Sequence, residues 1–201
     1  MKKNVKKHLY WIIPVAIALI LLFWVVGSYN GLIGQDENVK KSWANVESTY
    51  QRRADLIPNL VNTVQGAVNF EKETQTKIAE LRTGAAAIKT EISNAQTPAE
   101  LDAAGDKLDN IVNGYRALNI NVENYPQLKA TENFLSLQDE LAGTENRINV
   151  ARQDYNKAVQ SYNVKVRRIP TNIIASLFGF ETKESFEAQA GAETAPEVNF
   201  V

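Results

Sequence analysis

Apolar residues recur at alternating steps of three and four along most of this chain. Four such series span residues 39–67, 74–92, 101–122 and 130–162. This spacing places the apolar side chains on one face of an α-helix and is typical of a coiled coil or a helix bundle. No series alternates with a period of two, so strands are not expected. The pattern predicts an all-α fold in which long antiparallel helices form a four-helix-bundle-like domain.

Breaks in the pattern predict where the helices begin and end. Thr97-Pro98-Ala99-Glu100 combines a capping threonine, a proline at the first helical position and a capping-box glutamate. Tyr125-Pro126 marks another break, because the residue before a proline disfavours the helical region. Pro58 lies inside a strong series and predicts a kink, and no turn signal separates the first two series. We therefore expect one bent helix over about 34–95 and a last long helix that stops at Pro170.

One segment differs from the periodic series because it is apolar on every face. The run from Leu9 to Gly27 carries no charged side chain and is flanked by aromatic residues at both ends. As a helix it would extend roughly 28 Å, close to the ~30 Å hydrocarbon core of a bilayer. We predict that residues 9–28 are a retained transmembrane anchor behind a basic tail, residues 1–8. A cleaved signal peptide, with a weak cleavage site at Val25–Ser28, is the alternative.

The charges beside this run predict its orientation. Four lysines precede the span, whereas the charges just after it roughly cancel; the four are Lys2, Lys3, Lys6 and Lys7. Positive residues favour the cytoplasmic side of a membrane. We expect a single-pass protein with a cytoplasmic N-terminus and its helical domain outside the cytoplasm.

Composition excludes several functional classes. The 22 basic and 23 acidic residues leave a formal net charge of −1, with no basic stripe beyond the N-terminus, so no nucleic-acid partner is expected. The chain has no cysteine, and its single histidine is His8, beside the apolar run. A Ser-His-Asp triad and a Glu-x-x-His metal motif are therefore missing from the helical domain. We expect no enzymatic activity, no cofactor and no metal.

Several short blocks in a fixed order carry a family resemblance. They are Tyr29-Asn30, Trp43, Arg52–Val61, Glu123–Leu128, Leu137–Leu141, Glu145–Ile148, Ala151–Asn156, Tyr162-Asn163 and Ile169-Pro170. The ordered set resembles the LemA family of bacterial membrane proteins. The resemblance implies a single-pass protein of the bacterial cell (inner) membrane with a helical bundle over residues 29–181. It implies no defined enzymatic activity, and it suggests a scaffold or partner role beside another membrane protein.

Polar residues in the first series form one candidate interaction site. Arg53 falls on the apolar seam, where an unpaired charge is costly, so we expect an acidic partner, either Asp55 or Glu123. Such a pair would set the helix register. Alternatively, Arg52, Arg53 and Asn59 form an anion or partner site at the proline kink.

A seven-residue repeat marks the last long series. Tyr155-Asn156 recurs as Tyr162-Asn163, and Glu145, which precedes Asn146, is also seven residues from Arg152. Residues seven apart occupy equivalent heptad positions, so the tyrosines should lie in the seam with the asparagines and Arg152 at its margin. The polar residues either set the register or line a groove that recognises a peptide or a helix.

A corner between helices is expected at Glu123-Asn124-Tyr125. Asn124 is a suitable N-cap, and Tyr125 can pack its ring while its hydroxyl finds a polar partner. This corner is either a packed structural turn or a binding loop.

The C-terminal region changes character after Pro170. Residues 171–178 predict a short amphipathic helix, and the polar composition predicts a flexible tail over 182–201. The last residues are a candidate ligand for a partner's sheet edge, through the alternating Val198 and Phe200 and the terminal Val201. An unstructured terminus is the alternative.

These expectations converge on a non-enzymatic, membrane-anchored scaffold or adaptor. Its expected partners are the lipid bilayer and another membrane protein. The alternative is a self-assembling structural component of the cell envelope, which would be a homo-oligomer. A hydrolase is the least favoured class.

Overall fold

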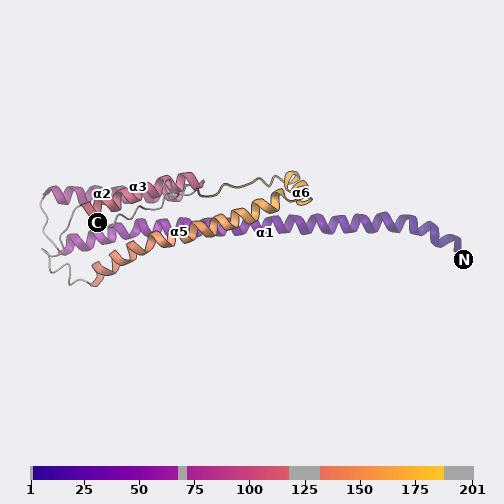
Figure 1. The fold of residues 1–201 in the computed structure, drawn as a ribbon, viewed down its shortest axis with the longest axis horizontal. Coiled ribbons are helices and arrows are strands. Elements are labelled where there is room, and N and C mark those ends of the chain that lie inside the picture. The colour runs from indigo at the N-terminus through magenta and orange to yellow at the C-terminus, as the bar shows by residue number, and fades with distance from the viewer. Residues whose placement is uncertain (1, 68–71, 118–131, 188–201) are drawn as a thin grey trace, which may run out of the picture. The chain divides into compact units, whose positions relative to one another are not determined.

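The computed structural model describes residues 2–67, 72–117 and 132–187, and the regular secondary structure within these ranges is entirely helical (Figure 1). The helices are α1 (Lys2–Ala67), α2 (Lys72–Asn94), α3 (Pro98–Ala117), α5 (Glu132–Arg167) and α6 (Thr171–Leu177). The predicted all-α fold is confirmed. The chain divides into two compact units. One contains α1 up to Ser42 together with Lys157–Lys183, and the other contains Trp43–Asn156 together with the segment from Glu184.

The second unit is an antiparallel bundle of α2, α3 and the adjoining parts of α1 and α5. Contacts between α1 and α2 run in opposite directions along the chain: Asp55 pairs with Lys89 at 2.6 Å, and Gln51 bonds Ser93 at 3.2 Å. The expected single bent helix over 34–95 is therefore wrong, because α2 packs back against α1. The periodic pattern concealed the reversal, although Gly66 and Asn69 are residue types that favour turns. The expected helix through Pro58 is confirmed, since α1 continues to Ala67.

The core of this unit contains many of the residues that the periodic series predicted, together with others outside the series, such as Val61 and Val112. All four helices contribute fully buried or nearly fully buried side chains, including Val46, Ile57, Leu60, Ile78, Ile92, Leu101, Leu108 and Ile148. Burying one such side chain stabilises a fold by about 1.5–3 kcal/mol before the loss of conformational entropy is counted. The apolar faces thus account for the association of the helices.

The start of α3 confirms the predicted capping box. The backbone N–H of Glu100 donates to Thr97 Oγ1 at 3.2 Å, and the Glu100 carboxylate accepts from the N–H of Gln96 at 2.8 Å. Pro98 is the first helical residue, where its missing N–H costs no hydrogen bond.

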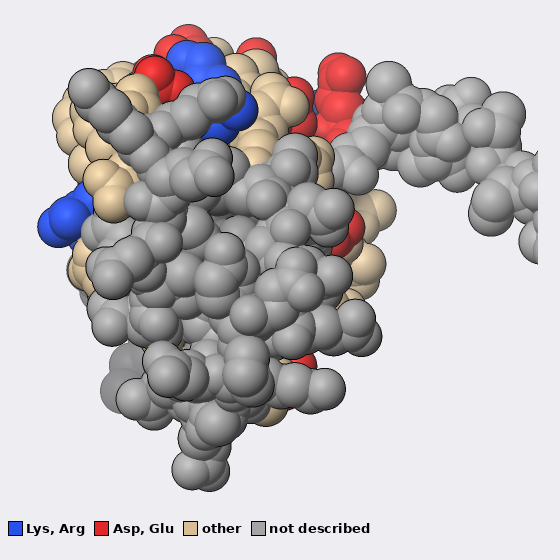
Figure 2. All heavy atoms as spheres, turned by 90° about the vertical axis from the view of Figure 1, so that its left-hand side faces the viewer, with Lys and Arg blue, Asp and Glu red and all other residues tan. Residues whose placement is uncertain are grey.

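Charged residues on the outside of the bundle are mixed in sign. Lys107 pairs with Glu91 at 2.7 Å, in addition to the pair between Lys89 and Asp55, and all four side chains are largely exposed. Where described atoms are visible in Figure 2, basic side chains lie beside acidic ones. Exposed pairs of this kind contribute only about 0–1 kcal/mol each.

The first unit contains the long apolar segment. Within the described residues, α1 has the one stretch that is long and apolar enough to cross a membrane, with a mean hydropathy of 2.4 and none of it buried. Beyond it, Leu32 and Val39 are buried, and Lys165 of α5 donates to the carbonyl of Gly31 at 2.8 Å. The first bundle helix was expected to start near Gly34, but α1 continues without interruption from the apolar segment.

Two helical glycines offer a matched test of the packing in the bundle. A Cβ at Gly105 would lie 2.7 Å from Cε1 of the buried Tyr50 ring, whereas a Cβ at Gly143 would meet nothing within 4 Å. We expect Gly105→Ala to lower the free energy of unfolding by about 1–3 kcal/mol through overpacking. Gly143→Ala should raise it by about 0.5–1 kcal/mol through helix propensity. Chemical denaturation of the full chain in mild detergent, followed by circular dichroism, measures both, and equal effects would contradict this packing.

Candidate functional site

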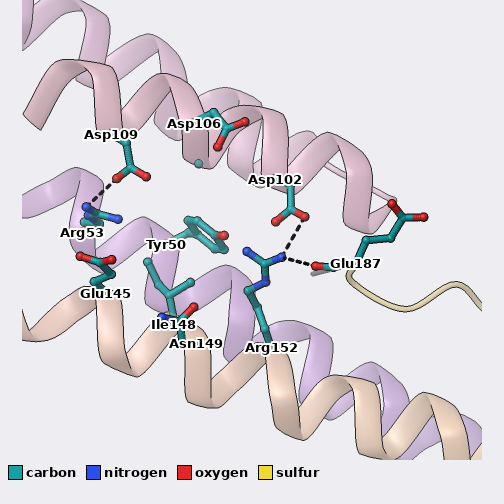
Figure 3. A pocket seen from close by; sticks show the side chains of 11 residues that line it. Tyr50, Arg53, Asp102, Asp106, Asp109, Glu145, Ile148, Asn149, Arg152 and Glu187 are labelled. Carbon is teal, nitrogen blue, oxygen red and sulfur yellow. Dashed lines mark hydrogen bonds and ion pairs between the residues drawn. The ribbon is translucent and has the colours of Figure 1, made fainter. Parts of the chain in front are cut away.

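A polar cavity of about 520 Å³ lies between α1, α3 and α5 in the second unit (Figure 3). Its lining is rich in charged side chains and comprises Tyr50, Arg53, Asp102, Gly105, Asp106, Asp109, Glu145, Ile148, Asn149, Arg152 and Glu187. The absence of a Cβ at Gly105 leaves the space that the Tyr50 ring occupies. A close approach of two helices therefore shapes one wall of the cavity.

One buried and one largely buried arginine line this cavity, and each pairs with an aspartate of α3. Arg53 from α1 places Nη2 2.6 Å from Oδ1 of Asp109, and its side chain is 9% exposed. Arg152 from α5 places Nη2 3.0 Å from Oδ2 of Asp102. Arg53 Nε and Asp102 Oδ1 are buried without a hydrogen-bond partner. Asp102 and Asp109 are seven residues apart, or about two helical turns, so one face of α3 supplies both counter-ions.

Burial alters the ionisation of the groups that line the cavity. It raises the pKa of Asp102 and of Asp109, while the neighbouring arginines, Arg152 and Arg53, oppose the rise. Burial also raises the pKa of Tyr50 to about 12, so its hydroxyl stays protonated. Because the folded state favours the protonated aspartic acids, these two groups contribute stability at low pH that is lost as the pH rises through their folded pKa values. The cavity therefore loses negative charge on acidification earlier than an exposed carboxylate would.

The lining of the cavity carries more acidic than basic residues. Its five acidic residues, Asp102, Asp106, Asp109, Glu145 and Glu187, outnumber the two arginines. Figure 3 shows Asp106 on α3 between the two ion-paired aspartates, and Glu145 on α5 near Arg53. Within the described ranges, no group of three or more His, Asp or Glu side chains is arranged to hold a metal ion. The geometry suits a ligand with a positively charged organic group.

Two asparagines on α5 bind backbone groups of the segment that follows α6. Asn156 Nδ2 donates to the carbonyl of Phe186 at 2.9 Å, and its Oδ1 accepts from the Phe186 N–H at 2.9 Å. Asn163 makes the same pair of bonds with Lys183, both at 2.8 Å. Each asparagine amide thus bonds the backbone N–H and C=O of one residue, as a neighbouring β-strand would.

The repeat of seven on α5 supplies one such pair of bonds to each unit. Asn163 and Lys183 belong to the first unit, and Asn156 and Phe186 belong to the second. The Tyr155 hydroxyl adds a bond to the carbonyl of Glu184 at 3.2 Å. The repeat therefore places side chains that hold an extended segment.

Phe186 anchors this segment within the second unit. Its buried ring stacks on Trp43 with the centroids 6.0 Å apart and meets the Tyr155 ring edge-on at 5.2 Å. The Arg152 guanidinium lies 4.8 Å from the same ring, and its Nη2 donates to the carbonyl of Glu187 at 3.1 Å. The polar composition predicts a flexible chain from residue 182 onward. The contacts of residues 183–187 correct that expectation. Amino-acid composition alone does not show that one phenylalanine ring is buried, or that two asparagines bind the backbone of this segment.

The structure separates the candidate residues of the first series. Arg53 pairs with Asp109 rather than with Asp55, which instead pairs with Lys89. Arg52 is exposed, and its Nε donates to Glu140 Oε1 at 2.9 Å. Arg52 and Asn59 line a separate, shallow groove and do not reach the cavity.

The remaining candidates lie in different environments. Glu145 and Arg152 line the cavity, whereas Asn146 is exposed on α5. Tyr162 is buried in the first unit, where burial raises its pKa and the Lys183 ammonium lies 5.3 Å from its ring. Six candidates lie outside the described residues, and their roles stay predictions: Glu123, Asn124, Tyr125, Val198, Phe200 and Val201.

Several lining residues were missed by sequence reasoning. Asp102 and Asp109 directly follow the seam residues Leu101 and Leu108, and this repeat of an acid beside the seam is the signal that could have identified them. Tyr50 belongs to the apolar series over 39–67, and that series predicts only a core position for it. Glu187 reaches the cavity only because the extended segment packs beside it, and the periodic pattern of apolar residues does not predict this position.

Arg53 is more deeply buried than its partner Asp109, so removing either side chain should lower the free energy of unfolding by a different amount. Asp109→Asn leaves the buried Arg53 charge without a counter-ion and should lower the free energy of unfolding by about 3 kcal/mol. Arg53→Met leaves a carboxylate whose side chain is 43% exposed, so water solvates it and the loss should be about 1 kcal/mol. Denaturation of both full-length variants measures the difference. A larger loss from Arg53→Met would contradict the assigned burial.

The asparagine pairs predict a local change in backbone protection. Asn156→Ala removes two hydrogen bonds to Phe186, each worth about 1 kcal/mol. Hydrogen exchange in peptides that cover residues 183–187 should accelerate roughly tenfold or more, as measured by mass spectrometry. Asn146→Ala is the matched control, because Asn146 is an exposed asparagine of the same helix. Equal exchange in the two variants would show that Asn156 does not hold the segment.

Comparison with known proteins supplies relatives for this chain. The profile of the LemA family matches residues 42–200. The protein is 27% identical to Protein LemA of Metamycoplasma hominis over 169 residues, which cover 84% of this chain and 73% of the relative. It is 25% identical to Magnetosome protein MamQ 2 of Paramagnetospirillum magneticum over 203 residues, covering 93% of this chain and 75% of that protein. The match includes the bundle, both arginine–aspartate pairs and the asparagine repeat, and the chain belongs to the LemA family.

Proposed function

We propose that this protein is a non-catalytic, membrane-anchored adaptor whose acidic cavity receives a basic side chain of a partner membrane protein. The observation that carries the proposal is the cavity lining, which contains five acidic residues and two arginines. A lysine ammonium or an arginine guanidinium fits this charge, and a volume of about 520 Å³ accommodates such a side chain with neighbouring residues.

The chemistry of the cavity favours binding over catalysis. Asp102 and Asp109 are already engaged with arginines, and the pKa of Tyr50 is too high for a base at neutral pH. Asp106 on α3 and Glu145 on α5 both line the cavity and supply carboxylates in addition to the two ion-paired aspartates (Figure 3). The names of the LemA and MamQ relatives do not denote enzymes, which supports a non-enzymatic role.

The apolar segment of α1 supports the membrane part of the proposal. It exposes a continuous apolar surface that a bilayer would cover. Tethering restricts the protein to partners in or beside the same membrane and raises their effective concentration. A cavity that contributes only modest affinity is then sufficient for a stable encounter.

Neutralising two cavity carboxylates tests the adaptor role. Asp106→Asn with Glu145→Gln removes two negative charges and leaves both arginine–aspartate pairs intact. Full-length protein is crosslinked in its membrane and purified in mild detergent, and partners are quantified by mass spectrometry. We expect the yield of a crosslinked membrane protein to fall at least tenfold, which corresponds to about 1.4 kcal/mol.

The control variant is Glu80→Gln with Asp139→Asn, which changes the net charge equally at two exposed sites outside the cavity. It should retain the partner at the wild-type level. Equal retention by the cavity variant would refute the cavity's role. Crosslinks formed between copies of this chain alone would favour the self-assembling envelope component instead.

A further inference from the structure

The short helix α6 exposes large apolar side chains in the first unit. Its inner face is buried through Ile174 and Ala175. On its other side, Ile173 is 63% exposed and Leu177 is 74% exposed. The residues that flank the helix continue this surface, since Ile169 is 78% exposed and Phe178 is 50% exposed. We refer to these four exposed side chains as the α6 apolar surface.

Contacts with α1 place this surface beside the end of the apolar segment. The Tyr29 ring lies 4.8 Å from the Phe178 ring and 5.7 Å from the Phe180 ring, measured between centroids. Tyr29 follows Gly27, the end of the uncharged run, by two residues, or about 3 Å of helix. When α1 spans a bilayer, these rings lie at the boundary between lipid and water, where aromatic side chains are favoured.

The charges next to α6 fit the same boundary. Arg167, the last residue of α5, and Arg168 are both exposed and precede Ile169 directly. Basic residues beside an apolar surface interact favourably with anionic lipid headgroups. Lys165 also lies at this end of α5 and bonds the carbonyl of Gly31.

We propose that the α6 apolar surface inserts into the membrane interface and forms a second lipid contact beside the α1 span. Three observations carry the proposal: four exposed apolar side chains within ten residues, ring contacts to α1 just beyond the apolar run, and adjacent arginines. A single spanning helix can rotate about its axis and tilt in the bilayer. A short helix held in the interface beside it fixes the rotation and depth of the first unit.

The chain contains no cysteine, so single-cysteine labelling can test this contact without background. Full-length Ile173→Cys and Leu177→Cys variants carry an environment-sensitive NBD label and are reconstituted in vesicles of phosphatidylcholine and phosphatidylglycerol. Ile20→Cys, inside the apolar run, reports whether α1 is inserted. Gln153→Cys is the aqueous control, because it is exposed on α5 about four helical turns before Arg167.

We expect lipids with a nitroxide near the headgroup to quench the labels at Ile173 and Leu177 several-fold more than the label at Gln153. Aqueous iodide should show the opposite order. Strong iodide quenching at both α6 positions, with the Ile20 label still in lipid, would overturn the proposal and leave the adaptor function intact. Labels protected from both quenchers would also overturn it and would indicate a protein partner, such as a second copy.

A charged variant provides an independent measurement. Ile173→Asp with Leu177→Asp alters only exposed positions and should preserve helicity by circular dichroism. A label at Ile169→Cys in that background should lose several-fold of its lipid quenching, because two carboxylates disfavour insertion. Unchanged quenching in the folded variant would refute the role of these two side chains.

Discussion

Two arginine side chains that are largely withdrawn from water constrain the register of the bundle. A guanidinium taken out of water needs an anion with suitable geometry, and leaving it unpaired is costly. Helix α3 supplies both anions, Asp109 for Arg53 of α1 and Asp102 for Arg152 of α5. Shifting α3 by one residue along its neighbours would separate both pairs at once. The register of three helices therefore depends on two ion pairs, while the apolar seam supplies the driving force for association.

The same constraint produces the cavity. Large polar groups on facing helices keep the helices from closing over a continuous apolar interface, and Gly105 adds space where the Tyr50 ring enters. The result is a half-buried environment that raises the pKa of Asp102 and Asp109. An excess of carboxylates over arginines then gives this environment a negative character. The proposed site for a basic group would therefore be formed in part by the same residues that set the register.

The parts of the structure that could be predicted from sequence are those encoded by local spacing. The three-four series placed Tyr50, Ile78, Leu108 and Ile148 in the core, and the capping box placed the start of α3. The reversal between α1 and α2 was missed because a turn leaves no gap in an amphipathic series. The partner of Arg53 was missed for a different reason: Asp109 lies 56 positions away (109 − 53), and only the packing of α3 brings the two together.

The extended segment after α6 gives the Tyr-Asn repeat of α5 a role that its heptad spacing does not predict. Inward asparagines at equivalent heptad positions usually pair with another helix and set its register. Here Asn156 and Asn163 face backbone groups, and one asparagine amide matches the N–H and C=O of one extended residue. Because these bonds involve only main-chain atoms, they place little restriction on the sequence that they hold. The side-chain contact of this segment comes instead from Phe186, whose ring packs against both Trp43 and Tyr155, which also contact each other. The tyrosines and asparagines of the repeat therefore make different contacts. The Tyr155 and Tyr162 rings contact the side chains of Phe186 and Lys183, and the asparagine amides hold the backbone of the same two residues.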